Sequence, residues 1–94
     1  MDDSLREKLD ARAQHQLSHG ELKGPVEVLI RMDTRPTPQQ QAELHAELHA
    51  AGCNVHFADE NVVSGTVAEP ANLAEVSRLG FVRQIEVSRP MFAR

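Results

Sequence analysis

Residues 26 to 52 read VEVLIRMDTRPTPQQQAELHAELHAAG, and this stretch decides the fold. From Val26 to Met32 every second residue is apolar, which predicts a strand with one buried face. Thr37 to Gln40 then supplies an N-cap, a first-turn proline and a capping-box partner, so the start of a helix is well fixed. Gly52 ends that helix. Its buried stripe consists of Leu44, Leu48 and Ala51.

Two short alternations of apolar and polar residues follow this helix. Val55 and Phe57 alternate as a second strand, and because strand side chains alternate they are expected on the same face. Residues 58 to 61 are expected to form the turn after it. The third strand has its apolar face at Val63, Gly65 and Val67.

A second helix and a fourth strand complete the pattern. The helix begins with Pro70 in its first turn and ends at Gly80 as a left-handed stop, and residues 81 to 87 predict an edge strand. This order of elements predicts an α+β ferredoxin-like β-α-β-β-α-β sandwich: a four-stranded antiparallel sheet carries both helices on one face and leaves the other face open. One core is expected, with Leu44, Leu48, Leu73, Val76 and Leu79 against Val28, Ile30, Val63 and Ile85.

Residues 1 to 24 form a charged N-terminal extension ahead of a domain at residues 25 to 94, whose tail is residues 88 to 94. The apolar residues of the extension recur at four-residue spacing, at Leu5, Leu9 and Ala13. One alternative is therefore a charged amphipathic helix that packs on the domain or on a second copy of the chain. The other is a frayed, disordered extension, because the apolar face is thin.

The composition excludes several classes of function. A chain of 94 residues makes one domain with one modest core. The net charge of −4, and three Phe without Tyr or Trp, argue against a nucleic-acid partner. No apolar run approaches the ~20 residues of a membrane-spanning helix. Residues 1 to 10 lack the hydrophobic region of a secretory signal, so a cytoplasmic location is expected unless a signal sequence has been removed.

The sequence predicts neither a metal site nor a cofactor. His45 and His49 lie one helical turn apart, a spacing that zinc can use, but the sequence supplies no recognisable third or fourth ligand. Cys53 is the single cysteine and is expected to be a small buried thiol. Ser64 and Ser88 lack the glycine-elbow context of a hydrolase nucleophile. No catalytic residue is assigned, and the chain is not expected to be an enzyme.

Residues 70 to 88 read PANLAEVSRLGFVRQIEVS: a proline, a leucine-containing helix, a glycine and a strand. With this motif, the sequence from Val26 to Arg94 resembles the subtilisin-propeptide family, whose members are chaperone-inhibitors of subtilisin-like serine proteases or free-standing inhibitors. The end of the family's last strand, valine, glutamate, any residue and aspartate, matches at Glu86, and Ser88 replaces the aspartate. The family's asparagine-glycine-aromatic opening of the third strand is absent at residues 62 and 63, which are valines.

The resemblance implies a mode of inhibition. In the family the open sheet face lies on two surface helices of the protease, carboxylates at the end of the last strand cap those helices, and the C-terminal residues enter the active-site cleft as a product-like strand. Here Arg94 would fill the first specificity pocket and Met91 the fourth, apolar pocket. A monomer is expected. The implied partner-binding residues are Leu29, Ser64, Thr66, Glu86, Ser88, Met91, Phe92, Ala93 and Arg94.

The alternative is a non-enzymatic homodimeric interaction or regulatory module. Ferredoxin-like domains also pair through open sheet faces or edge strands, and fold alone does not decide function. Met91 and Phe92 would then pack on a second subunit. A monomer with a mobile tail favours the inhibitor, whereas a dimer with an ordered tail favours the module.

Overall fold

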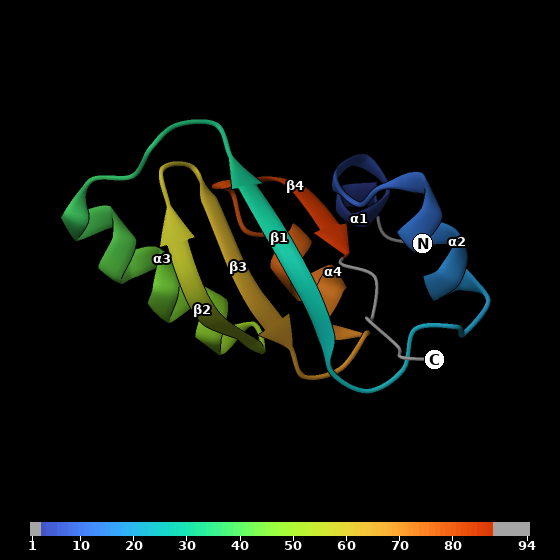
Figure 1. The fold of residues 1–94 in the computed structure, drawn as a ribbon. Helices are drawn as coiled ribbons and strands as arrows, with labels where there is room; N and C mark the ends of the chain where they lie inside the picture. Colours follow the sequence, from blue (N-terminus) through green and yellow to red (C-terminus); the bar gives the residue numbers. More distant parts are fainter. Residues whose placement is uncertain (1–2, 88–94) are drawn as a thin grey trace.

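The computed structural model of the chain describes residues 3–87, which form one four-stranded antiparallel sheet in the order β2-β3-β1-β4 (Figure 1). The elements are α1 (Asp3–Lys8), α2 (Ala11–Ser18), β1 (Val26–Met32), α3 (Pro38–Ala50), β2 (Cys53–Asp59), β3 (Val62–Val67), α4 (Asn72–Ser77) and β4 (Val82–Val87). The predicted α+β, ferredoxin-like arrangement is confirmed, and helices are present in the N-terminal extension. No helix among residues 3–87 has both the length and the apolar character to cross a membrane.

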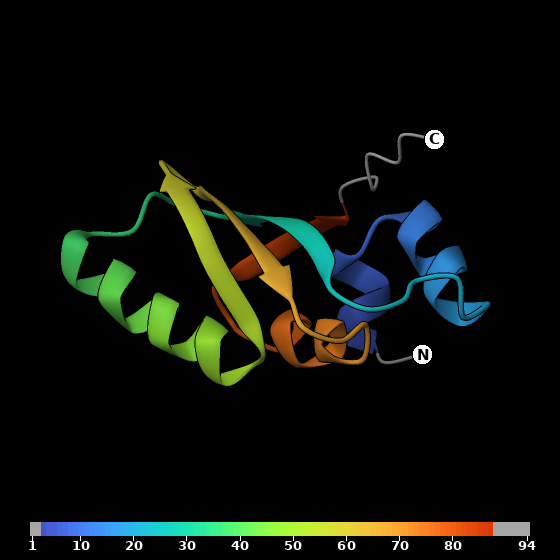
Figure 2. The same cartoon turned by 60° about the horizontal axis from the view of Figure 1, so that its bottom comes forward.

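Helices α3 and α4 lie on one side of the sheet, and the opposite side carries no helix over its central strands (Figure 2). Val26, Val28, Ile30 and Met32 of β1 face the helices, with exposures between 0% at Ile30 and 5% at Val26 and Met32. The predicted core is buried as expected except for Leu79, which is only partly buried against it. Its fully or almost fully buried members are Leu44, Leu48, Leu73, Val76, Val28, Ile30, Val63 and Ile85.

The start and end of α3 follow the local sequence signals. The Thr37 hydroxyl accepts a hydrogen bond from the backbone N–H of Gln40 at 3.2 Å, and the Gln40 side chain accepts one from the backbone N–H of Thr37 at 3.0 Å. This reciprocal pair satisfies two donors that a helix N-terminus otherwise leaves without partners. Gly52 follows the helix with φ of +90°, a left-handed conformation that glycine adopts without strain.

Two predictions about α4 are wrong. The helix begins at Asn72 rather than in a first turn containing Pro70, because the backbone at residues 69 to 71 forms a turn in which the Asn72 side chain accepts from the N–H of Glu69 at 3.0 Å. Gly80 is not in the left-handed region. The chain instead leaves the helix through two consecutive turns, in which the N–H of Leu79 donates to Val76 O and the N–H of Val82 donates to Leu79 O, both at 3.1 Å.

The N-terminal helices pack on the β4 side of the domain (Figure 1). Leu5, Leu9 and Ala13 are at most 4% exposed and belong to the same apolar cluster as the sheet and α4. Lys8 Nζ donates to a backbone carbonyl of the last residue of α4, Ser77 O at 2.7 Å, and to one just after the helix, Leu79 O at 3.3 Å. For residues 3–18 the structure therefore shows packing on the domain, not a frayed extension.

Candidate protein-binding face

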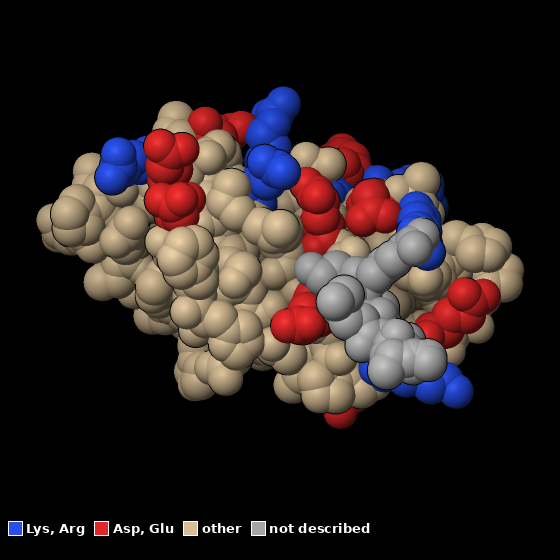
Figure 3. All heavy atoms as spheres, viewed as in Figure 1, with Lys and Arg blue, Asp and Glu red and all other residues tan. Residues whose placement is uncertain are grey.

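The side of the sheet turned away from α3 and α4, here called the open face, is built by the outward side chains of all four strands. Figure 3 looks onto this side: an uncharged area lies over β2 and β3, and charged side chains gather along the top of the view and toward β4. The outward side chains are Glu27, Leu29, Arg31, Asn54, His56, Phe57, Asp59, Val62, Ser64, Thr66, Gln84 and Glu86.

One row of residues crosses the open face at right angles to the strands. Phe57 pairs with Ser64, Ser64 pairs with Leu29, and Leu29 pairs with Glu86. We call these four residues the transverse row. Directly paired side chains on one sheet face lie about 5 Å apart, so the row is a continuous strip from the β2 edge to β4. Its chemistry runs from aromatic through small and aliphatic to acidic.

The sequence prediction for the partner-binding residues falls partly on this face. Leu29, Ser64 and Glu86 lie in the transverse row, and Thr66 lies two residues from Ser64 along β3, so the fold brings the four together. The remaining predicted residues lie outside the described residues: Ser88, Met91, Phe92, Ala93 and Arg94.

Arg31 is a member of the face that the sequence did not single out. Its Nε donates to Glu86 Oε2 at 2.7 Å, with side-chain exposures of 47% and 39%. At such exposure an ion pair contributes at most about 1 kcal/mol to folding, so its main effect is to orient the carboxylate. The residues are 55 apart in sequence, and only the β1–β4 register, which pairs Leu29 with Glu86, makes them diagonal neighbours.

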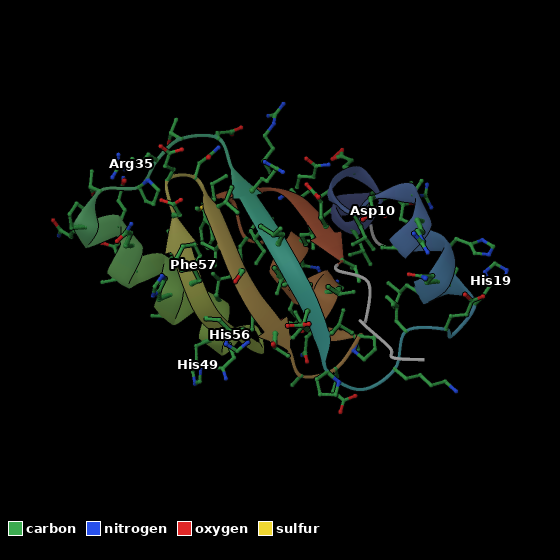
Figure 4. The ribbon with its side chains drawn as sticks, in the orientation of Figure 1. Asp10, His19, Arg35, His49, His56 and Phe57 are labelled. Atoms are coloured by element: carbon green, nitrogen blue, oxygen red, sulfur yellow. The ribbon has the colours of Figure 1, made fainter. Side chains whose placement is uncertain are left out.

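The placement of Phe57 corrects the sequence prediction. Val55 pairs with Gly65 and Phe57 pairs with Ser64, so a bulge between them turns Phe57 to the opposite face from Val55. Phe57 is 63% exposed and points outward from β2 (Figure 4), whereas strict alternation predicts the same face as Val55. The bulged His56 reaches along the same face, where its Nε2 lies 2.6 Å from Thr66 Oγ1.

Gly65 supplies a local reason for this irregularity. A Cβ at this position would stand 2.6 Å from Asn54 O and 3.0 Å from Cys53 Sγ, so β2 approaches β3 more closely than a side chain allows. The absence of a side chain at Gly65 therefore allows β2 to approach β3 closely beside the bulge. The bulge in turn creates the exposed aromatic end of the transverse row.

The other candidate groups stay apart from the open face. Cys53 is buried, and burial raises the pKa of its thiol to about 11, which keeps it protonated and unreactive near neutral pH. No three His, Cys, Asp or Glu side chains in the part of the chain that the structure describes are grouped to hold a metal ion. His45 Nε2 is buried with no hydrogen-bond partner among residues 3–87, and His49 is exposed on α3.

A hollow of about 350 Å³ lies elsewhere, between the first half of α3 and the loop after β1. Met32, Leu44 and Phe81 contribute apolar surface to it, and acidic side chains including Asp33 stand around it. Arg83 Nη1 lies 3.0 Å from Asp33 Oδ1, so this charge has a partner. The hollow contains none of the residues predicted for partner binding.

Comparison with known proteins adds no relative to this picture. No protein-family model, no curated protein and no solved structure matches the chain. The geometry of the open face is therefore the basis for assigning a function.

Proposed function

We propose that this chain binds and inhibits, or assists the folding of, a subtilisin-like serine protease. In this proposal the open face lies on the protease's surface helices, and residues 88 to 94 enter its active-site cleft. The observation that carries the proposal is the transverse row, which ends in the Glu86 carboxylate one residue before the end of β4. The row combines an apolar contact strip with an acceptor close to the tail.

The chemistry of the row suits the N-terminus of a helix. Helix N-termini present backbone N–H groups without partners and a partial positive charge, and a carboxylate satisfies both. Glu86 is oriented by Arg31 through Oε2, and a carboxylate has the capacity to accept further bonds through Oε1. Leu29 and the small side chains of Ser64 and Thr66 let a helix approach the sheet closely.

The tail supplies the contact with the active site. An extended segment that follows an edge strand adds to a cleft through its backbone, and its alternate side chains enter pockets. Arg94 occupies the first pocket in this proposal and Met91 the fourth. A guanidinium in the first pocket needs an acidic partner there, so the target cleaves after basic residues.

An inhibition assay tests this function. The full chain is titrated against subtilisin-like proteases that cleave after Arg and after apolar residues. Inhibition of the first group is expected at micromolar concentration or below; deletion of residues 91 to 94 removes it, and Arg94→Leu shifts it toward the second group. Glu86→Gln weakens it by about 0.5–2 kcal/mol, the range for losing a capping acceptor, whereas Glu75→Gln, an exposed change on α4, leaves it unaltered. Failure to slow any of these proteases, or equal inhibition by the deleted chain, would reject the proposal.

A homodimeric interaction module is the second candidate function. The exposed ring of Phe57 favours it, because it lies in one row with Leu29 and extends the apolar part of the open face to the β2 edge. The oligomeric state of the chain, measured without a protease, separates the two candidates. A module is dimeric at the concentration at which it acts, whereas the inhibitory species is a monomer whose open face is free for the protease.

A further inference from the structure

The outward side chains of β1 carry a self-complementary charge pattern. Glu27, Leu29 and Arg31 occupy alternate positions on the open face, so a negative, an apolar and a positive side chain follow one another along the strand. Successive outward positions are about 7 Å apart. Leu29 stands at the centre, with opposite charges at equal distances on either side. Reversing the direction of the strand therefore exchanges the two charges.

We propose that the open face pairs with the open face of a second copy of this chain, around a two-fold axis along the transverse row. Such an axis lies between the two sheets, reverses the strand direction and keeps each strand over its own counterpart. Leu29 then faces Leu29 of the second copy, and Arg31 faces Glu27 of the second copy. The crossing angle of about 30° between packed sheets shifts facing residues by ~3 Å at these positions, a distance that long side chains span.

The same two-fold rotation also places residues of β3 and β2 opposite residues of the second copy. Val62 and Thr66 lie on opposite sides of the row on β3, so each faces the other across the axis. On β2, Asp59 comes over Asn54 of the second copy and beside its bulged His56, so an amide and an imidazole lie near the carboxylate. The exposed Phe57 rings lie at the axis itself and leave water together. Apolar contacts at the centre with charged pairs around them are the usual arrangement of a protein interface.

The acidic end of the row is compatible with this pairing because of Arg31. The two Glu86 carboxylates approach the axis from both copies, and each already accepts a hydrogen bond from its own Arg31 Nε at 2.7 Å. A guanidinium has five N–H donors, so the Nη groups can bind Glu27 of the second copy while Nε holds Glu86. A chain of alternating charges then crosses the interface at β1 and β4.

The small size of the face limits the strength of this association. Four strands at the usual spacing, each about 20 Å long, make a footprint of roughly 400 Å² on each copy. An interface of this size belongs to the weak, transient class. The chain is therefore a monomer when dilute, and the dimer forms at protein concentrations on the order of 100 µM.

Sedimentation equilibrium of the full chain tests the pairing without any protease. Arg31→Glu and Glu27→Arg each place like charges opposite one another, so each is expected to weaken the dimer about tenfold or more. The double variant Glu27→Arg/Arg31→Glu restores opposite charges across the axis but removes the partner of Glu86, so its dissociation constant is expected to lie between those of the original chain and of the single variants. Arg12→Glu on α2 and Glu47→Arg on α3 make the same charge changes at exposed sites away from the open face. Both control variants are expected to leave the dissociation constant of the dimer unchanged.

Phe57→Ser provides a second, uncharged test, because it removes an exposed ring and no core side chain. It is expected to weaken the dimer as strongly as either single charge reversal. A chain that stays monomeric up to ~1 mM, well above the expected range, a double variant as weak as the single ones, or an unaffected Phe57→Ser dimer would each overturn the pairing. Because these measurements contain only this chain, they can reject the pairing while protease inhibition still holds. The inhibition assay can equally fail while the pairing holds. Competition between the protease and the second copy for the open face is the one consequence that rests on the proposed function.

Discussion

Leu9 forms a parallel backbone bridge with Ile85 at the outer edge of β4. Both side chains are almost fully buried, at 3% and 0% exposure, so the segment that joins α1 to α2 closes a sheet edge and extends the core. Exposed edges of sheets are templates for unwanted pairing, and covering one with another segment prevents it. The N-terminal residues thereby leave β2 as the edge without a partner among residues 3–87.

Leu9→Ala is expected to lower the free energy of unfolding by about 2–5 kcal/mol, as for other buried leucines. Leu17→Ala, at a partly buried leucine of α2, serves as the control and should cost clearly less. Urea denaturation followed by circular dichroism measures both. A loss for Leu9→Ala that is as small as the loss for Leu17→Ala would show that Leu9 does not belong to the core.

Leu48→Ala and Ile30→Ala test the assignment of the two sides of the sheet. Both side chains are 0% exposed, Leu48 on α3 and Ile30 on the helix-facing side of β1, so each truncation should lower the free energy of unfolding by about 2–5 kcal/mol. Leu29→Ala is the matched control, because Leu29 lies on the same strand but on the open face. Thermal unfolding measures the three variants. If Leu29→Ala were the most destabilising of them, the assignment of the two sheet faces would be wrong.

The sequence predicted the elements whose signals are local. The alternation of β1 and the capping box of α3 each lie within a few consecutive residues, and both appear in the structure as expected. The end of α4 was predicted wrongly because a glycine after a helix is a common left-handed stop, whereas here two hydrogen-bonded turns at residues 76 to 82 connect α4 to β4 without a positive φ at Gly80. The Leu5–Leu9–Ala13 stripe was visible, but its thinness hid how deeply it is buried.

The open face was harder to predict because its geometry depends on strand register. The bulge that exposes Phe57 follows from the close approach of β2 to Gly65, a contact between segments that alternation within one strand does not report. Arg31 and Glu86 become neighbours only when β1 and β4 pair in one particular register. Period-two patterns give the face of a residue but neither its cross-strand partner nor the position of a bulge.

The pH dependence of stability should carry the signature of Cys53. Burial raises the pKa of its thiol from 9.0 to about 11 in the folded chain, whereas the unfolded chain keeps the ordinary value. Above pH 9 the unfolded state therefore loses its proton first, so the folded state holds more protons and stability falls as the pH rises toward about 11. Below pH 9 both states are protonated and this loss is absent.

Cys53→Ala removes that contribution. Its free energy of unfolding should be lower near neutral pH because of the lost contact, but it should decline less than that of the original chain between pH 9 and about 11. Urea titrations of the two proteins across this range measure the difference, in which the other titrating groups cancel. Parallel curves would show that the thiol is not held in its neutral form by the fold.

The most direct test of the central claim is to map which residues respond when a protease binds. A ¹⁵N-labelled full chain is titrated with a subtilisin-like protease that cleaves after basic residues and whose catalytic serine is replaced by alanine. Backbone resonances of Leu29, Ser64, Thr66 and Glu86 are expected to shift or broaden together with those of the tail, while those of Glu43 and Glu47 on the exposed side of α3 stay in place. An unchanged spectrum, or changes confined to the helices, would contradict the open face as the site of protease binding.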